Sequence, residues 1–157
     1  MKTKLILAAF AAILPFVSPS FAADEHDHEH HEKIAGPNGG RVITSVEPHL
    51  EFFRQDDGKV KITAVDEEGK VIPLGGTEVS VTGGDRSKPA KLTFAKEGDS
   101  MISDKAFPEG KNLPVVLRVK SSEDAQPVYE RFTLNLSECP ECDHLEYACT
   151  CDHDHEH

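Results

Sequence analysis

Polar and apolar residues alternate along much of the chain from residue 40 onward. In residues 59–66, Val60, Ile62 and Ala64 fall on one face of an extended segment, and the residues between them are mostly polar. A period of two predicts a β-strand with one buried face. Similar segments recur along the body, and we expect strands at residues 41–45, 50–55, 59–66, 71–74, 78–82, 90–96, 101–105, 114–121 and 129–136.

Turn residues separate these segments. Asp57-Gly58 and Glu68-Gly69 each lie between two expected strands, and the body shows no apolar stripe typical of a helix. We therefore predict an all-β domain over residues 40–138, an antiparallel β-sandwich of about 7–9 short strands, with a barrel as the related alternative. The residues expected to face its core are Val42, Leu50, Phe52, Val60, Ile62, Ala64, Val79, Val81, Leu92, Phe94, Ile102, Leu113, Val115, Leu117, Val119, Phe132 and Leu134.

Residues 1–22 have the composition of a secretory signal. Lys2 and Lys4 give a positive start, residues 5–17 are apolar, and Ser20-Phe21-Ala22 offers the small residues that a signal peptidase reads. The apolar run is too short to cross the roughly 30 Å hydrocarbon core of a bilayer, so an uncleaved anchor is the less favoured alternative. We expect export to the periplasm, a mature chain that begins at Ala23, and no membrane span after the signal is removed.

Charge and histidine are distributed unevenly. The chain has 157 residues and a formal net charge of −11, which argues against a nucleic-acid partner because phosphate binding needs a basic surface. Residues 40–138 carry 14 basic and 17 acidic side chains, so most of the negative charge lies in residues 23–39 and 139–157. Eight of the nine histidines lie in these two ends. We expect the ends to be disordered, His-rich tails that carry the function.

The N-terminal tail contains a run, residues 24–32, made only of carboxylates and imidazoles. Neutral imidazole binds Zn²⁺, Cu²⁺ and Ni²⁺, and neighbouring carboxylates add oxygen donors and a negative field. The alternative is a solvated tail whose composition resists folding, and both interpretations can hold for one segment. The candidate metal ligands are His26, His28, His30 and His31.

The C-terminal tail, residues 139–157, holds all four cysteines. Cys139 and Cys142 form one pair, and Cys149 and Cys151 can supply a second pair after a short loop. Four thiolates suit a tetrahedral Zn²⁺ or Cd²⁺ site, or a thiolate site for Cu⁺. In such a site one cysteine can be replaced by His144. A separate, weaker site is expected from His153, His155 and His157.

Oxidation of the cysteines is the competing interpretation. Exported cysteines in even number usually pair, and a bacterial periplasm keeps them oxidised. A disulfide from Cys139 or Cys142 to Cys149 or Cys151 would leave only imidazoles to bind metal. Catalytic redox chemistry is the weakest interpretation, because Cys139-x-x-Cys142 lacks the strand-then-helix setting that lowers the pKa of a thiol.

The start of the body carries a recognisable motif. Residues 36–43, Gly-Pro-Asn-Gly-Gly-Arg-Val-Ile, are followed by Leu50-Glu51-Phe52 and then by Asp57-Gly58-Lys59-Val60. From about residue 24 to 120 the chain resembles the small N-terminal β-domain of cobalt–zinc–cadmium efflux adaptors. That family usually opens with Gly-Pro-His-Gly-Gly, and Asn38 stands here in place of the histidine. The resemblance implies a free-standing relative of that domain; from the residues alone, 36–41 are a flexible turn.

Together these observations predict an exported, non-enzymatic metal-binding protein that sequesters or hands over heavy-metal ions. Zn²⁺ is the first expectation, with Cu²⁺, Ni²⁺ and Cd²⁺ as the other candidates, and a metal efflux complex is the expected partner. The alternative is a disulfide-stapled β-domain that binds a protein partner and has no specific metal role. If the C-terminal tail is flexible, deleting residues 139–157 should leave the thermal midpoint of the body nearly unchanged.

Overall fold

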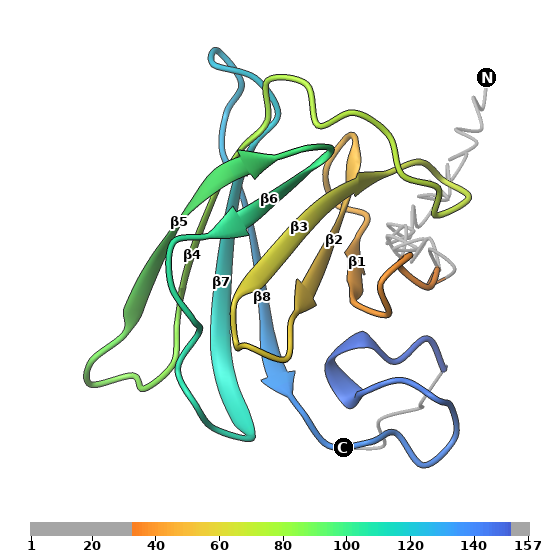
Figure 1. The fold of residues 1–157 in the computed structure, drawn as a ribbon, viewed down its shortest axis with the longest axis vertical. Helices are drawn as coiled ribbons and strands as arrows, with labels where there is room; N and C mark the ends of the chain where they lie inside the picture. Colours follow the sequence, from red (N-terminus) through yellow and green to blue (C-terminus); the bar gives the residue numbers. More distant parts are fainter. Residues whose placement is uncertain (1–32, 152–157) are drawn as a thin grey trace, which may run out of the picture. The chain divides into compact units, whose positions relative to one another are not determined.

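The computed structural model describes residues 33–151, which lie within one compact unit of the chain, His31–His157. They form eight strands and one short 3₁₀ helix, and none of these residues forms a helix long and apolar enough to cross a membrane (Figure 1). The all-β class and the number of strands are confirmed. The elements are β1 (Arg41–Ile43), β2 (His49–Arg54), β3 (Val60–Val65), β4 (Glu78–Gly83), β5 (Ala90–Glu97), β6 (Ser100–Ser103), β7 (Asn112–Lys120), β8 (Val128–Asn135) and η1 (Glu146–Ala148).

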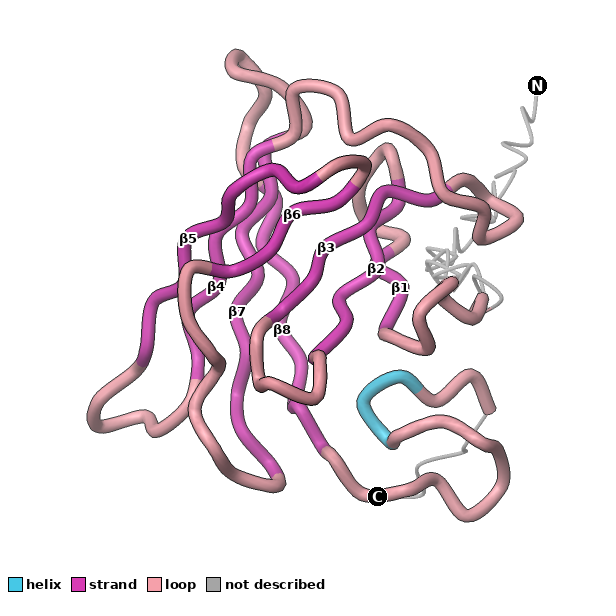
Figure 2. The backbone as a smooth tube through the Cα atoms, viewed as in Figure 1, coloured by secondary structure: helices cyan, strands magenta, loops and turns pink. Residues whose placement is uncertain are grey.

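Hydrogen bonds join the eight strands into one antiparallel sheet in the order β1-β2-β3-β6-β5-β4-β7-β8 (Figure 2). Strand β5 provides the continuity, because residues 90–93 pair with β4 whereas residues 94–97 pair with β6. A strand that passes from one half of a sheet to the other joins what would otherwise be two layers. The fold is therefore a nearly closed, barrel-like sheet, which corresponds to the barrel alternative more closely than to the sandwich.

One expected strand, residues 71–74, does not form. Val71 makes only an isolated bridge to Val65, and the residue is 48% exposed. Pro73 lacks the backbone N–H that a ladder requires, and two glycines follow Leu74, so the segment leaves the sheet. Its apolar residues nevertheless contribute to the core, because Leu74 is buried.

The core is filled mainly by the alternating residues of the central strands. Two predictions had the wrong phase: Ile43 is buried instead of Val42, and Met101 instead of Ile102. Met101 lies opposite the buried Ile62, so the register of β3 and β6 decides which face of β6 is inside. The predicted residues found buried are Leu50, Phe52, Val60, Ile62, Ala64, Val81, Leu92, Val115, Leu117, Val119 and Leu134, and those found partly buried against the core are Val79, Phe94, Leu113 and Phe132.

The first and last strands of the sheet order, β1 and β8, are connected by side chains. Arg41 of β1 pairs with Glu130 of β8 at 3.7 Å between Nη2 and Oε1, and its guanidinium lies 5.1 Å from the ring centroid of Phe132. Phe132 meets Phe52 of β2 edge to face, with centroids 5.1 Å apart. We call the line formed by these four residues the β1/β8 seam. The cysteine-bearing segment lies beside this seam.

Candidate metal centre

The four cysteines come together at one point. The sulfur atoms of Cys139, Cys142, Cys149 and Cys151 all lie within 4.8 Å of one another. Two of the distances between sulfurs are 3.4 Å, from Cys139 to Cys149, and 3.8 Å, from Cys142 to Cys149. Zinc–sulfur bonds of about 2.3 Å in a tetrahedron place neighbouring sulfurs about 3.8 Å apart. The cluster therefore has the size required to bind a metal ion with four thiolates in a tetrahedron.

A short hairpin holds the first pair of cysteines directly after β8. Glu138 and Leu145 form an antiparallel bridge. The N–H of Cys139 donates to the carbonyl oxygen of His144 at 2.9 Å. The N–H of Glu146 donates to the carbonyl oxygen of Ser137, also at 2.9 Å. These bonds turn the chain back on itself, so that the loop containing Cys142 is closed at its base.

The helix η1 returns the second pair of cysteines to the first. It begins after Leu145, which has an extended backbone, and ends before Cys149, whose N–H reaches the carbonyl oxygen of Glu146 at 3.4 Å. The N–H of Cys151 then donates to the sulfur of Cys149 at 3.3 Å. A backbone N–H aimed at sulfur stabilises the thiolate that a metal needs.

The surroundings of the thiols make their acidities unequal. The pKa of Cys142 is lowered, chiefly because the backbone N–H of His144 donates a hydrogen bond to its sulfur. Burial raises the pKa of Cys149. The pKa of Cys151 is raised to about 12, mainly because its thiol is hydrogen-bonded to Cys142. Of these three thiols, Cys142 ionises most readily and Cys151 holds its proton longest.

The structure describes the cysteines as thiols. The 3.4 Å between the sulfurs of Cys139 and Cys149 is much longer than the roughly 2.05 Å of a disulfide bond. The sulfurs are thus separate donor atoms, and Cys139 and Cys149 lie close enough that oxidation to a disulfide would need only a small movement.

His144 lies next to this cluster and contributes through its backbone. Within residues 33–151, the group of close donor atoms consists of the four cysteines, and the imidazole of His144 is not part of it. His144 instead lines a polar hollow together with Cys139 and Cys142. The remaining predicted ligands lie outside the described residues: His26, His28, His30, His31, His153, His155 and His157.

The C-terminal segment is packed onto the body, so the expectation of a flexible tail is wrong for residues 139–151. Tyr147 and Ala148 are 3% and 5% exposed and belong to the same core cluster as the strands. Leu145 packs against that cluster as well. The ligands and acids of the segment predict a solvated tail, whereas its apolar residues Leu145, Tyr147 and Ala148 are the sequence signal that part of it is buried.

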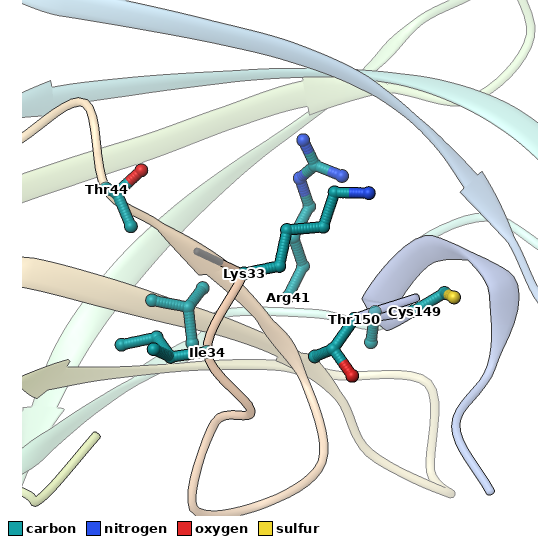
Figure 3. Close-up of a pocket in the computed structure, with 8 residues that line it drawn as sticks. Lys33, Ile34, Arg41, Thr44, Cys149 and Thr150 are labelled. Carbon is teal, nitrogen blue, oxygen red and sulfur yellow. The ribbon is translucent and has the colours of Figure 1, made fainter. Parts of the chain in front are cut away.

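A pocket lies where the C-terminal segment meets β1 (Figure 3). It is lined by Lys33, Arg41, Cys149 and Thr150, among others, and the side chains of Lys33 and Arg41 point the same way in Figure 3. Lys33 Nζ donates to the carbonyl oxygen of Cys151 at 3.0 Å. Lys33 follows the first His-rich run in the sequence and Cys151 precedes the second. The two runs therefore attach to the described part of the chain at neighbouring points.

The motif at residues 36–40 encloses a carboxylate. Glu51 is fully buried in β2, and its carboxylate accepts hydrogen bonds from the backbone N–H groups of Asn38 and Gly40, both at 2.8 Å. The side-chain amide of Asn38 also donates to Glu51, at 2.6 Å. A Cβ on Gly36 would lie 2.3 Å from the carboxylate, so the loop can approach this closely only with glycine there.

The glycine-rich motif is thus an ordered loop rather than the flexible turn expected from its residues. Asn38 also accepts a hydrogen bond from Lys61 Nζ at 3.1 Å. Its amide is used to hold Glu51 in place. Within the described residues the motif therefore contributes to the fold, and the grouped metal donors lie elsewhere, at the cysteines.

Comparison with known proteins does not assign the chain to a family: no family model, no curated protein and no solved structure matches it.

Proposed function

We propose that this protein binds a thiophilic metal ion through Cys139, Cys142, Cys149 and Cys151. The observation that carries this proposal is the mutual approach of the four sulfurs within 4.8 Å, from two sequence pairs that a hairpin and η1 bring together. Thiolate ligands in tetrahedral geometry favour Zn²⁺, with Cd²⁺ and Cu⁺ as chemical relatives. Zn²⁺ is therefore the proposed ion, and Cu²⁺ and Ni²⁺ are proposed for the imidazoles of the His-rich runs.

The proposed role is storage or transfer of the ion rather than catalysis. Four cysteine ligands complete the coordination of Zn²⁺, whereas catalytic zinc keeps one position open for water or substrate. Three of the four cysteines are only partly buried, so an incoming ligand can reach the centre from solvent. Accessible thiolates next to anionic, His-rich runs suit an exchange of ions between weak and strong donors.

The proposed setting is the periplasm, beside a heavy-metal efflux complex. Support comes from the signal-like residues 1–22 and from the resemblance of the motif at residues 36–43 to efflux adaptors. An exported protein that takes up excess ions would protect the cell by sequestering them or by presenting them to an efflux partner.

Native mass spectrometry of the protein purified from the periplasm tests this proposal. We expect a mature chain that begins at Ala23 and holds one ion tightly, with Zn²⁺ as its identity. Cys142→Ser and Cys151→Ser should each weaken binding more than about 100-fold, because a ligand is removed. His144→Ala is the matched control beside the cluster and should retain the ion, since four thiolates suffice.

Two results would contradict the proposal. A chain whose thiols are blocked by disulfides and that takes up no Zn²⁺, Cu²⁺ or Ni²⁺ would favour the alternative, a disulfide-stapled domain that binds a protein partner. Retention of the ion by all the cysteine variants would place the site elsewhere.

A further inference from the structure

The helix η1 lies across the β1/β8 seam. It packs against both β1 and β8, the two strands that end the sheet order (Figure 1). Its residues therefore cover the place where side chains, and not strand pairing, hold the two ends of the sheet together. The segment that forms this cover, residues 139–151, is also the segment that contains the four cysteines.

Tyr147 is the residue by which this segment attaches to the body. Its ring packs edge to face on Phe52, with centroids 6.3 Å apart, and it is 3% exposed. Its hydroxyl oxygen accepts a hydrogen bond from the backbone N–H of Arg54, the last residue of β2, at 3.3 Å. Both contacts join η1 to a strand next to the seam.

The position of Tyr147 also decides where the second cysteine pair lies. Only Ala148 separates Tyr147 from Cys149, and the N–H of Cys149 is bonded to Glu146. The sulfur of Cys149 lies 3.4 Å from that of Cys139 and 3.8 Å from that of Cys142. If Tyr147 left its place on Phe52, Cys149 would move away from the other sulfurs.

We propose that docking of Tyr147 on Phe52 and metal binding by the four cysteines are one coupled event. This inference rests on the proposed function. Tyr147 is then a positioning residue for the metal centre, and the C-terminal segment is a cover that the ion holds closed over the β1/β8 seam.

The coupling must act in both directions, because linkage between two equilibria is reciprocal. The ion, by gathering the thiolates, holds Tyr147 on the body, and Tyr147, by holding η1, prearranges the thiolates for the ion. Apart from the sulfur cluster, the segment is held on the body by the apolar contacts of Leu145, Tyr147 and Ala148 and by hydrogen bonds from Arg54 and Lys33. These contacts are few, so loss of the ion should uncover the Phe52 side of the seam.

Tyrosine emission provides a direct measurement of this event. The chain has no tryptophan and two tyrosines, and Tyr129 is 48% exposed. In a Tyr129→Phe background, Tyr147 is the remaining tyrosine. We expect quenching of its emission by acrylamide to rise when a chelator removes Zn²⁺ and to fall again when Zn²⁺ is restored. The amide hydrogen of Arg54 should likewise exchange slowly only in the metal-loaded protein.

Variants of Tyr147 test the coupling from the other side. Tyr147→Ala should weaken Zn²⁺ binding at least tenfold although Tyr147 is not a ligand, and Tyr147→Phe should restore most of that loss because it keeps the ring on Phe52. Tyr129→Ala is the matched control and should leave the affinity unchanged. With Co²⁺ as the probe, Tyr147→Ala should keep the charge-transfer band of a four-thiolate site but reach it at higher metal concentration.

The outcomes separate this inference from the proposed function. If the protein binds Zn²⁺ tightly but Tyr147 is equally buried before and after chelation, the coupling is overturned and the proposed metal binding is not. Wild-type affinity in Tyr147→Ala would do the same. Absence of any metal uptake by the unmodified chain would remove the proposed function itself. If Tyr147→Ala does not fold, Tyr147→Phe and the exchange of the Arg54 amide in the unmodified chain still decide the matter.

Discussion

The four cysteines have the same side chain, but the folded chain gives them different acidities. A hydrogen bond from the backbone N–H of His144 lowers the pKa of Cys142, while the pKa of Cys151 is raised to about 12 by its bond to Cys142. Burial raises that of Cys149. Metal binding requires thiolates, so the ion must displace the protons that remain on the thiols with raised pKa values.

We therefore expect metal affinity to fall as the pH falls. Near neutral pH, Cys149 and Cys151 hold their protons because their pKa values are raised, so at least two protons should leave when Zn²⁺ binds. Calorimetry in buffers of different ionisation enthalpy measures this number, and Cys151→Ser should release about one proton fewer. If the affinity for Zn²⁺ did not change between about pH 6 and pH 8, that result would contradict the described protonation of the cluster.

At the scale of elements, the loop of residues 36–40 and strand β2 form a unit around one buried charge. Glu51 points into the loop from β2 and is held by two backbone N–H groups and by the amide of Asn38. A buried carboxylate is stable only where hydrogen bonds replace its lost water. The loop and the strand thus depend on each other, although their sequences are separated by β1.

Glu51→Gln should lower the free energy of unfolding by about 2–3 kcal/mol, because a neutral amide replaces a charged acceptor and presents an NH₂ group to N–H donors. Urea unfolding measures the change. Glu97→Gln is the matched control, an exposed carboxylate in β5, and should change stability by less than about 0.5 kcal/mol. Metal stoichiometry should be the same in both variants. Loss of the ion in Glu51→Gln alone would show that the loop supports the metal centre.

At the scale of the whole described unit, the cysteine segment is part of the domain. Tyr147 and Ala148 complete the core cluster, and η1 packs on both β1 and β8. This differs from the expectation that the body folds independently of its C-terminal end. A segment that supplies buried side chains to the core contributes to the stability of everything packed around it.

Deletion of residues 139–157 should accordingly lower the thermal midpoint, by about 5–10 °C, because it uncovers Phe52 and removes Tyr147 from the core. Differential scanning calorimetry with Zn²⁺ present throughout measures this change. Deletion of residues 152–157 alone is the control and should leave the midpoint close to that of the full chain. Equal midpoints for both truncations would restore the earlier expectation of an independent body.

The sequence by itself determined the all-β class, all eight strands, with one extra strand expected at residues 71–74, and the residues with metal-binding chemistry. These follow from local properties: the period of two along segments such as residues 59–66, turn residues such as Asp57-Gly58, and the grouping of Cys139, Cys142, Cys149 and Cys151. Local patterns could not choose between Val42 and Ile43, because that choice depends on pairing with distant strands. For residues 71–74, Pro73 and the two glycines after Leu74 were a local signal against a strand.

Only the tertiary structure decided that the four sulfurs meet within 4.8 Å, that the thiols differ in acidity, and that the segment carrying them is docked through Tyr147. It also decided that the glycine-rich loop surrounds Glu51. The physical reason is the same in each case. Ligand distance, hydrogen bonding and burial arise between residues far apart in the chain, and a one-dimensional pattern carries no measure of such distances.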